Sequence, residues 1–231
     1  MLFDECPPYP CDHEYAARSL ERTTRWATRC VQVATRGKKF GIIQGSVYAD
    51  LRRQSAESLV ALDLDGYAIG GVSVGEPEHE MMAAVENSEP YLPPHKARYA
   101  MGLGKPHQIV ELVARGVDMF DCVLPTRVAR NGTAFVSTGT LNLKNAQHRF
   151  SELPIEEGCA CPACTTFSRA YLRHLVKANE ILGLRLLTLH NLHFYLNLMR
   201  QIRESLANGS FTAFRRAFHA KQAETRAAEN T

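Results

Sequence analysis

The chain has 231 residues, of which 45% are apolar and 22% charged, enough for one large domain or two small ones. This composition excludes a disordered segment, a collagen-like fibre and a small disulfide-stapled domain. No apolar run approaches the roughly 18 residues of a membrane span, and the N-terminus lacks the pattern of a signal peptide. We therefore expect a cytoplasmic protein with reduced thiols and no membrane partner.

Basic residues gather toward the end of the chain. Overall, 27 Lys and Arg oppose 24 Asp and Glu, but residues 165–231 alone hold 10 basic and 4 acidic residues. Such a segment suits a polyanion such as RNA, because phosphate contacts supply the sequence-independent part of RNA binding. A solvated helix surface is the other explanation, and charge alone favours it.

The first part of the chain alternates between helical segments and short apolar runs. Helices are expected over residues 14–35, 47–63, 77–87 and 106–115. Strands are expected over residues 40–45, 67–74, 98–104 and 118–124. This alternation is typical of βα units and a parallel sheet, in which ligands gather at the carboxyl ends of the strands. The polar residues and glycines at those ends are candidate ligand contacts, although the glycines could serve turns alone.

The second part of the chain looks different. Residues 133–150 are polar and β-like, with a turn expected at 138–140, and helices are expected over 165–180, 191–207 and 211–226. Between them, three cysteines fall within six residues: Cys159, Cys161 and Cys164. Three thiolates and one imidazole would complete a tetrahedral zinc site, and four protein ligands would make the metal structural. Three histidines are candidates for the fourth ligand, which spacing does not separate: His174, His190 (at an expected helix start) and His193.

Asp121 lies at the expected carboxyl end of the fourth strand. A carboxylate held there can attack an anomeric carbon and form a glycosyl-enzyme ester. A buried capping aspartate is the alternative explanation, and position alone favours it.

Five motifs occur in order along essentially the whole chain. They are Phe3–Pro10, Gly41–Gly45, Gly70–Glu76, Phe120–Arg127 followed by Arg130–Gly132, and the cysteine cluster with His190–Leu192. Together they resemble the tRNA-guanine transglycosylase (queuine tRNA-ribosyltransferase) family. The resemblance implies a (β/α)₈ TIM-type barrel with an added zinc subdomain. It also implies an enzyme, a pentosyltransferase of queuosine biosynthesis, that exchanges guanine at the tRNA wobble position for another base.

The resemblance also assigns roles to residues. Asp121 matches the nucleophile that attacks the ribose C1′ and displaces guanine. The residues that match contacts to the base are Asp4, Cys6, Gln44, Gly70, Gly71 and Met101. Those that match contacts to the RNA are Gly102, Leu103, Gly104, Lys105, Pro106, His107, Gln108, Thr126, Arg127, Val128, Ala129 and Arg130. The zinc ligands would be Cys159, Cys161, Cys164 and His190, which selects among the histidines.

The partners follow from the same resemblance. Val74 and Cys6 resemble the residues of the bacterial type, which inserts the small 7-deazaguanine base preQ1. In the eukaryotic type, which takes queuine, a glycine stands at the position that matches Val74. The family suggests tRNAs with a guanine-first anticodon and a homodimer.

One departure from the family concerns the start of the chain. The family carries an acidic general acid/base in a segment that precedes the motif beginning here at Leu2, and a TIM barrel needs about 250 residues. We therefore expect the C-terminal half of a barrel over residues 1–135, and a zinc subdomain with C-terminal helices over 136–231. Impaired activity of the isolated chain is expected. The alternative is a truncated, non-catalytic fragment that binds tRNA or a partner.

Overall fold

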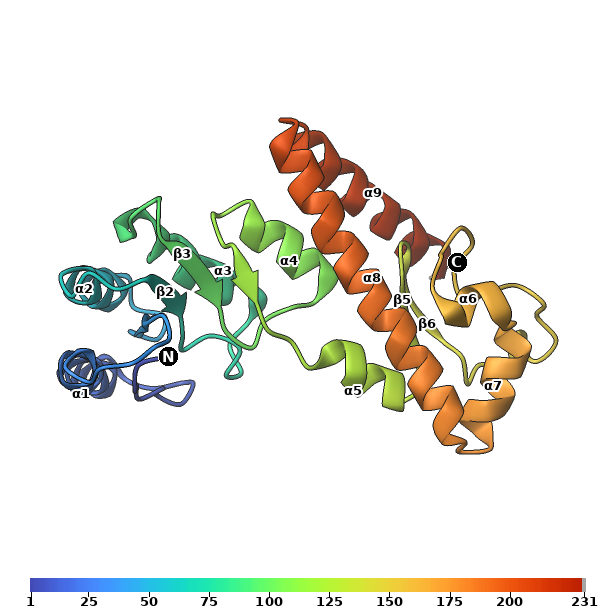
Figure 1. Cartoon of the computed structure of the whole chain (residues 1–231), viewed down its shortest axis with the longest axis horizontal. Helices are drawn as coiled ribbons and strands as arrows, with labels where there is room; N and C mark the ends of the chain where they lie inside the picture. The colour runs from blue at the N-terminus through green and yellow to red at the C-terminus, as the bar shows by residue number, and fades with distance from the viewer. Residues whose placement is uncertain (230–231) are drawn as a thin grey trace. The chain divides into compact units, whose positions relative to one another are not determined.

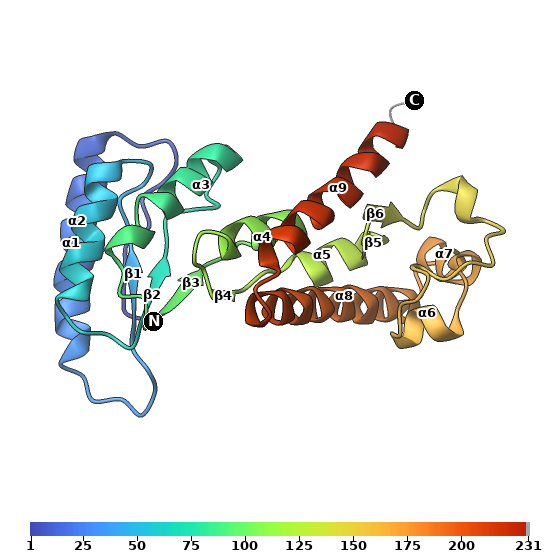
Figure 2. The ribbon, with the colours of Figure 1, turned by 90° about the horizontal axis from the view of Figure 1, so that it is seen from above.

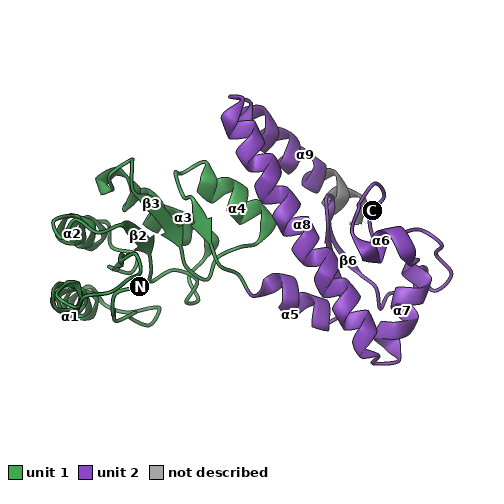
Figure 3. Ribbon diagram, viewed as in Figure 1, with its two compact units in different colours: residues 1–122 green, residues 123–231 purple. Residues whose placement is uncertain are grey.

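The computed structural model describes residues 1–229 and divides the chain into two compact units, Met1–Cys122 and Val123–Thr231 (Figure 3). The division falls before the expected boundary at residue 135, because the helix α5 (Leu124–Arg130) and the strand β5 (Thr133–Val136) pack on α8 (Ile181–Ala207) of the second unit. The last two residues of the expected second domain, 230–231, lie outside the described residues.

The first unit is an α/β layer, as expected (Figure 1). Its elements are α1 (His13–Val31), β1 (Phe40–Ile43), α2 (Ala49–Val60), β2 (Gly66–Ile69), α3 (Glu78–Glu86), the 3₁₀ turn η1 (Glu89–Tyr91), β3 (Ala97–Ala100), α4 (Pro106–Val113) and β4 (Met119–Phe120). The strands form one parallel sheet in the order β1-β2-β3-β4. Within residues 1–229 this sheet is open, so closure into a barrel stays a prediction.

The core of the first unit explains why these short runs become strands. Residues of β1 and β2 such as Ile43 and Tyr67 are almost fully buried, and they pack with Leu59 of α2. The helices α1 and α2 lie side by side (Figure 2). Residues 1–6 form no strand, although the Leu2 N–H donates to the Phe40 carbonyl at 2.9 Å.

The second unit consists of a hairpin and helices. Its elements are α5, β5, β6 (Gly139–Asn142), the 3₁₀ turn η2 (Ala146–His148), α6 (Pro162–Thr166), α7 (Arg169–Lys177), α8 and α9 (Phe211–Glu229). β5 and β6 pair antiparallel around a turn at residues 137–138, slightly before the expected turn at 138–140. The sequence analysis did not predict α5 or the first ten residues of α8, and it predicted one helix where the structure has α6 and α7. The core of the second unit includes four fully buried residues, Leu143, Ile155, Leu172 and Leu187.

Within residues 1–229, every helix is either too short or too polar to cross a lipid bilayer.

Candidate functional site

The carboxyl edge of the parallel sheet aligns four of the candidate residues. The register pairs Ile43 with Ile69, Ile69 with Ala100 and Ala100 with Phe120, so these residues form one row across the sheet. The residues that follow them in the chain form the next row: Gln44, Gly70, Met101 and Asp121. We call these four the edge row. The sheet register therefore brings together, from four separate strands, residues that the sequence marked one at a time.

At one end of the edge row, Asp4 and Gln44 form a hydrogen-bonded pair. The Gln44 side-chain amide donates to Asp4 Oδ2 at 2.6 Å, and the Gln44 backbone N–H donates to the Ser55 hydroxyl at 3.0 Å. Gln44 is 1% exposed, and its Oε1 has no hydrogen-bond partner among the described residues. An unpaired buried acceptor costs free energy, so Gln44 is suited to accept a hydrogen bond from a ligand.

The neighbouring glycines leave room for close approach. Gly71 adopts φ +64°, and a Cβ there would lie 2.5 Å from Gln44 Oε1, so only glycine fits. The loop that follows is held by Glu76, whose carboxylate accepts from the N–H groups of Ser73 and Val74. Cys6 is exposed, and burial of its sulfur and the Asp4 charge raise the pKa of its thiol.

At the other end of the edge row, Asp121 is oriented through one of its oxygens. Oδ1 accepts from the Tyr99 hydroxyl at 2.7 Å and from the Gly102 N–H at 2.9 Å. In the part of the chain that the structure describes, Oδ2 has no hydrogen-bond partner, and the residue is exposed. A carboxylate with one anchored and one accessible oxygen is arranged as a nucleophile requires, which argues against the capping explanation.

The Tyr99 phenol gives the site a pH dependence. Burial, and then the hydrogen bond to Asp121 and its charge, raise the pKa of Tyr99 to about 12. Because the pKa is higher in the folded state, its stabilising effect is complete below pH 10 and is lost as the pH rises through about 12. The ultraviolet titration of wild type minus that of Tyr99→Phe should therefore show one phenol ionising near pH 12. A difference centred near pH 10 would contradict this arrangement.

The segments expected to grip RNA are partly exposed. Residues with exposed or half-buried side chains are Lys105, His107, Thr126, Arg127, Val128 and Arg130, and the Gly102 backbone is also exposed. Five of the expected RNA contacts are instead buried: Leu103, Gly104, Pro106, Gln108 and Ala129. Gln108 holds the loop together, since its amide donates to Glu78 and its oxygen accepts from the Lys105 N–H. The buried residues thus shape these segments, and RNA contact stays a prediction for the accessible ones.

The cysteine cluster meets a single histidine. Nδ1 of His190 lies 3.9, 3.5 and 3.4 Å from the sulfurs of Cys159, Cys161 and Cys164, and the four ligand atoms all lie within 4.8 Å of one another. Ligands on a zinc tetrahedron stand roughly 3.6 Å apart, given Zn–S and Zn–N bonds near 2.3 and 2.1 Å. The donor set and its spacing fit one zinc ion, and four protein ligands make the site structural.

The protonation states also suit a metal. His190 Nε2 lies 2.7 Å from the Phe135 carbonyl, which can only accept, so Nε2 carries the proton and Nδ1 is left as the ligand. A hydrogen bond from the Cys164 thiol holds the pKa of Cys161 well below its usual range. His190 lies in the interior of α8 and not at the expected helix start, and it is fully buried. His174 and His193 are not part of the cluster.

Asn191, next to the metal ligand, ties three elements of the second unit together. Its amide donates to the carbonyls of Pro125 and Thr133 at 2.9 and 3.1 Å, and its oxygen accepts from the Phe135 N–H at 2.9 Å. The residue is fully buried. It therefore fixes α5, which bears the candidate RNA contacts, to the zinc-bearing helix α8.

Replacing Asn191 with leucine is expected to destabilise the second unit by about 3 kcal/mol or more, because three buried backbone groups lose their partner. Urea unfolding of the two proteins measures the difference. Asn197→Leu is the matched control: Asn197 lies on the same helix, is half-buried and accepts only from Arg200, so its effect should stay under about 1 kcal/mol. Equal losses of stability in the two variants would contradict the role of Asn191 in linking these elements.

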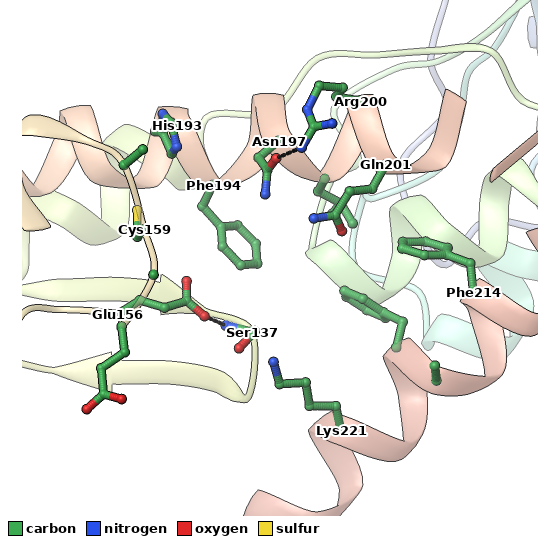
Figure 4. A pocket seen from close by; sticks show the side chains of 16 residues that line it. Ser137, Glu156, Cys159, His193, Phe194, Asn197, Arg200, Gln201, Phe214 and Lys221 are labelled. Carbon is green, nitrogen blue, oxygen red and sulfur yellow. Dashed lines mark hydrogen bonds between the residues drawn. The ribbon is translucent and has the colours of Figure 1, made fainter. Parts of the chain in front are cut away.

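The second unit also contains a cavity of about 700 Å³ beside the cysteine loop (Figure 4). His193, Asn197 and Gln201 border it from α8, and Phe214 and Lys221 from α9. Of the predicted zinc ligands, Cys159 lines it, as does the rejected candidate His193. The residues of the edge row all belong to the first unit.

Comparison with known proteins decides which family this arrangement belongs to. A family model described as queuine tRNA-ribosyltransferase matches residues 1–224. The chain belongs to the queuine tRNA-ribosyltransferase family. The edge row and the Cys₃His cluster are therefore interpreted as sites of this family. The cluster is the zinc site of the family.

Curated relatives that carry the name queuine tRNA-ribosyltransferase are similar over almost the whole chain. The protein of Symbiobacterium thermophilum is 57% identical over 98% of this chain and 58% of its own length. Those of Bacillus velezensis and Bacillus subtilis are 53% and 52% identical, each over 94% of this chain and 58% of their own length. The chain thus spans a little under three fifths of the length of these relatives.

Sequence reasoning missed two buried residues whose side chains hold backbone groups near the candidate sites. Arg52 is fully buried at the strand ends of the first unit, where it donates to the Gly70 carbonyl. Asn191 links α5 to α8 in the second unit through the Pro125 carbonyl. An arginine in a helix ordinarily indicates a solvated face. For Asn191, only its place in the motif His190–Leu192 singled it out.

Proposed function

We propose that this chain is a tRNA-guanine transglycosylase, which exchanges guanine at the anticodon wobble position of tRNA for preQ1. The observation that supports it most is the edge row, which combines a hydrogen-bonding platform for a heterocycle with an oriented carboxylate. By family resemblance we also propose tRNAs with a guanine-first anticodon as substrates, a homodimer, and a cytoplasmic location.

The groups around Gln44 suit recognition of a purine-like base. A carboxylate, a side-chain amide and backbone N–H groups lie close together at Asp4, Gln44 and Gly71. A base with mismatched donors and acceptors would leave these groups unpaired, which rejects it strongly. Met101, half-buried in the next position of the row, offers an apolar surface for the ring.

The chemical step follows from Asp121. Its accessible oxygen would attack C1′ of the ribose, forming an ester as the bond from C1′ to N9 of guanine breaks, and the electron pair would leave with guanine, which takes up a proton. N9 of preQ1 would then attack C1′, lose its proton and release the Asp121 carboxylate. Tyr99 and Gly102 hold the other oxygen in place throughout.

The tRNA itself would be held by cations. Lys105 precedes α4, and Arg127 and Arg130 are exposed on α5. Their charges suit the phosphates around an extruded wobble nucleotide, which must leave its stack to reach a pocket.

Incorporation of labelled guanine into tRNA tests the proposal, with the Bacillus subtilis relative as the positive control. The expected result is labelled tRNA and a covalent protein–RNA adduct that survives denaturing electrophoresis. Tight tRNA binding with neither exchange nor adduct would overturn the proposal and favour a non-catalytic tRNA-binding fragment.

A further inference from the structure

The first unit buries an arginine that makes no ion-pair contact with a carboxylate. Arg52 of α2 is 0% exposed, and among the side chains of residues 1–223 no carboxylate lies within ion-pair distance of it, although the more distant Glu76 charge favours the charged guanidinium. Burial lowers its pKa to about 10, so the guanidinium stays charged at neutral pH. Burying a charge without an opposite partner is costly, and a purely structural position would be filled more cheaply by an apolar side chain.

The guanidinium of Arg52 instead binds four backbone carbonyls at the ends of two strands. Nε donates to the Ser46 carbonyl at 2.6 Å, and Nη1 donates to the carbonyls of Ile43 and Gly70 at 3.2 and 2.6 Å. Nη2 donates to the Gly71 carbonyl at 3.1 Å. Two of these carbonyls flank Gln44, which follows β1, and the other two belong to the glycine pair that follows β2.

These contacts fix the direction of two peptide groups. In a planar trans peptide, the carbonyl and the following N–H point in opposite directions. Because Arg52 holds the carbonyls of Gly70 and Gly71, the N–H groups of Gly71 and Val72 point away from α2.

The same contacts support Gln44. A Cβ on Gly71 would lie 2.5 Å from Gln44 Oε1 and 3.3 Å from Arg52 Nη2, so the three residues are packed against one another. A shift of the strand ends would therefore move the Gln44 amide as well as the glycine N–H groups. Only arginine offers five donors in a rigid planar fork, and a lysine could not hold four carbonyls.

We propose that Arg52 is a positioning residue for base recognition, which aims the N–H groups of Gly71 and Val72 at the acceptor edge of a heterocycle and the Gln44 amide oxygen at one of its donors. This role rests on the proposed function, because it supposes that these groups contact the base. It makes Arg52 a determinant of base affinity that touches no substrate atom.

Guanine binding by calorimetry tests the role in wild type, Arg52→Lys and Arg52→Met. Both variants are expected to bind guanine at least tenfold more weakly, since lysine keeps the charge but not the fork. Their zinc content and tRNA affinity should stay within twofold of wild type, which a general loss of structure would not allow. Arg53→Lys is the matched control, because Arg53 is exposed and pairs with Glu57. Wild-type guanine affinity in Arg52→Lys would overturn the proposal.

Amide hydrogen exchange separates this proposal from the proposed function. If wild type binds no guanine, the base-recognition function fails, and the positioning role is judged by exchange at Gly71 and Val72. Exchange there should be at least tenfold faster in Arg52→Lys than in wild type, with Leu59 of α2 unchanged. Equal rates would overturn the role. If Arg52→Lys does not fold, the Arg52 Nε–H resonance of wild type must shift when guanine is added, and an unmoved resonance counts against the proposal.

Discussion

Asp121→Asn is expected to lower guanine exchange by at least about 10⁴-fold, the scale on which removal of a nucleophile acts. The asparagine oxygen can still accept from Tyr99 and Gly102, so the local geometry is kept. An amide, however, does not form the ester with C1′. The covalent adduct should therefore disappear from denaturing gels, while tRNA affinity, measured by filter binding, stays within twofold of wild type.

Asp118→Asn is the matched control for this substitution. Asp118 lies three residues earlier and accepts from the Arg98 N–H at 2.8 Å, a bond that an asparagine oxygen can also accept. Exchange by this variant should remain near the wild-type rate. Persistent adduct formation by Asp121→Asn, or equal losses in the two variants, would remove Asp121 from the role of nucleophile.

His190→Ala is expected to remove zinc and unfold the second unit. The side chain supplies the one imidazole of the cluster and links it to the Phe135 carbonyl of β5. Structural zinc sites contribute on the order of 10 kcal/mol of apparent binding free energy, which exceeds the stability of most small domains. Metal analysis should fall from one zinc per chain to almost none, with a loss of helical circular dichroism.

A neighbouring histidine and the single tryptophan provide the controls. His193→Ala, one helical turn away on α8 and outside the cluster, should keep its zinc. The chain contains one tryptophan, Trp26 of α1, so its fluorescence reports on the first unit alone. The Trp26 fluorescence should change little when zinc is removed. Full zinc content in His190→Ala would show that another residue completes the site.

The order of the strands could be predicted from the sequence because each is a short apolar run that ends in a turn signal. The ends of helices were harder. The first ten residues of α8, such as Leu182 and Leu189, are apolar on exposed as well as buried faces, so no amphipathic period marks them. Pro125 does not break the chain's helical structure, because proline is well tolerated in the first turn of a helix, which is where α5 places it.

The candidate site could also be predicted from the sequence only in part. Gln44, Gly70 and Asp121 of the edge row stand in the motifs that carry the resemblance, which also located Met101, but the common row of the four depends on the register between strands. The choice of His190 over His193 also came from the resemblance, and it is confirmed by the position of the side chain. Arg52 could not be predicted, because its contacts are with backbone carbonyls, which leave no trace in residue identity.

The Cys₃His cluster also acts on the unfolded chain. Its ligands join a six-residue segment to a histidine that stands 26 residues after Cys164. A bound ion is thus a cross-link that closes a loop containing α6, α7 and the start of α8. Closing such a loop restricts the unfolded chain by about 3 to 4 kcal/mol. The penalty rises only slowly with loop length, so insertions between α7 and α8 should be tolerated far better than any change that opens the cross-link.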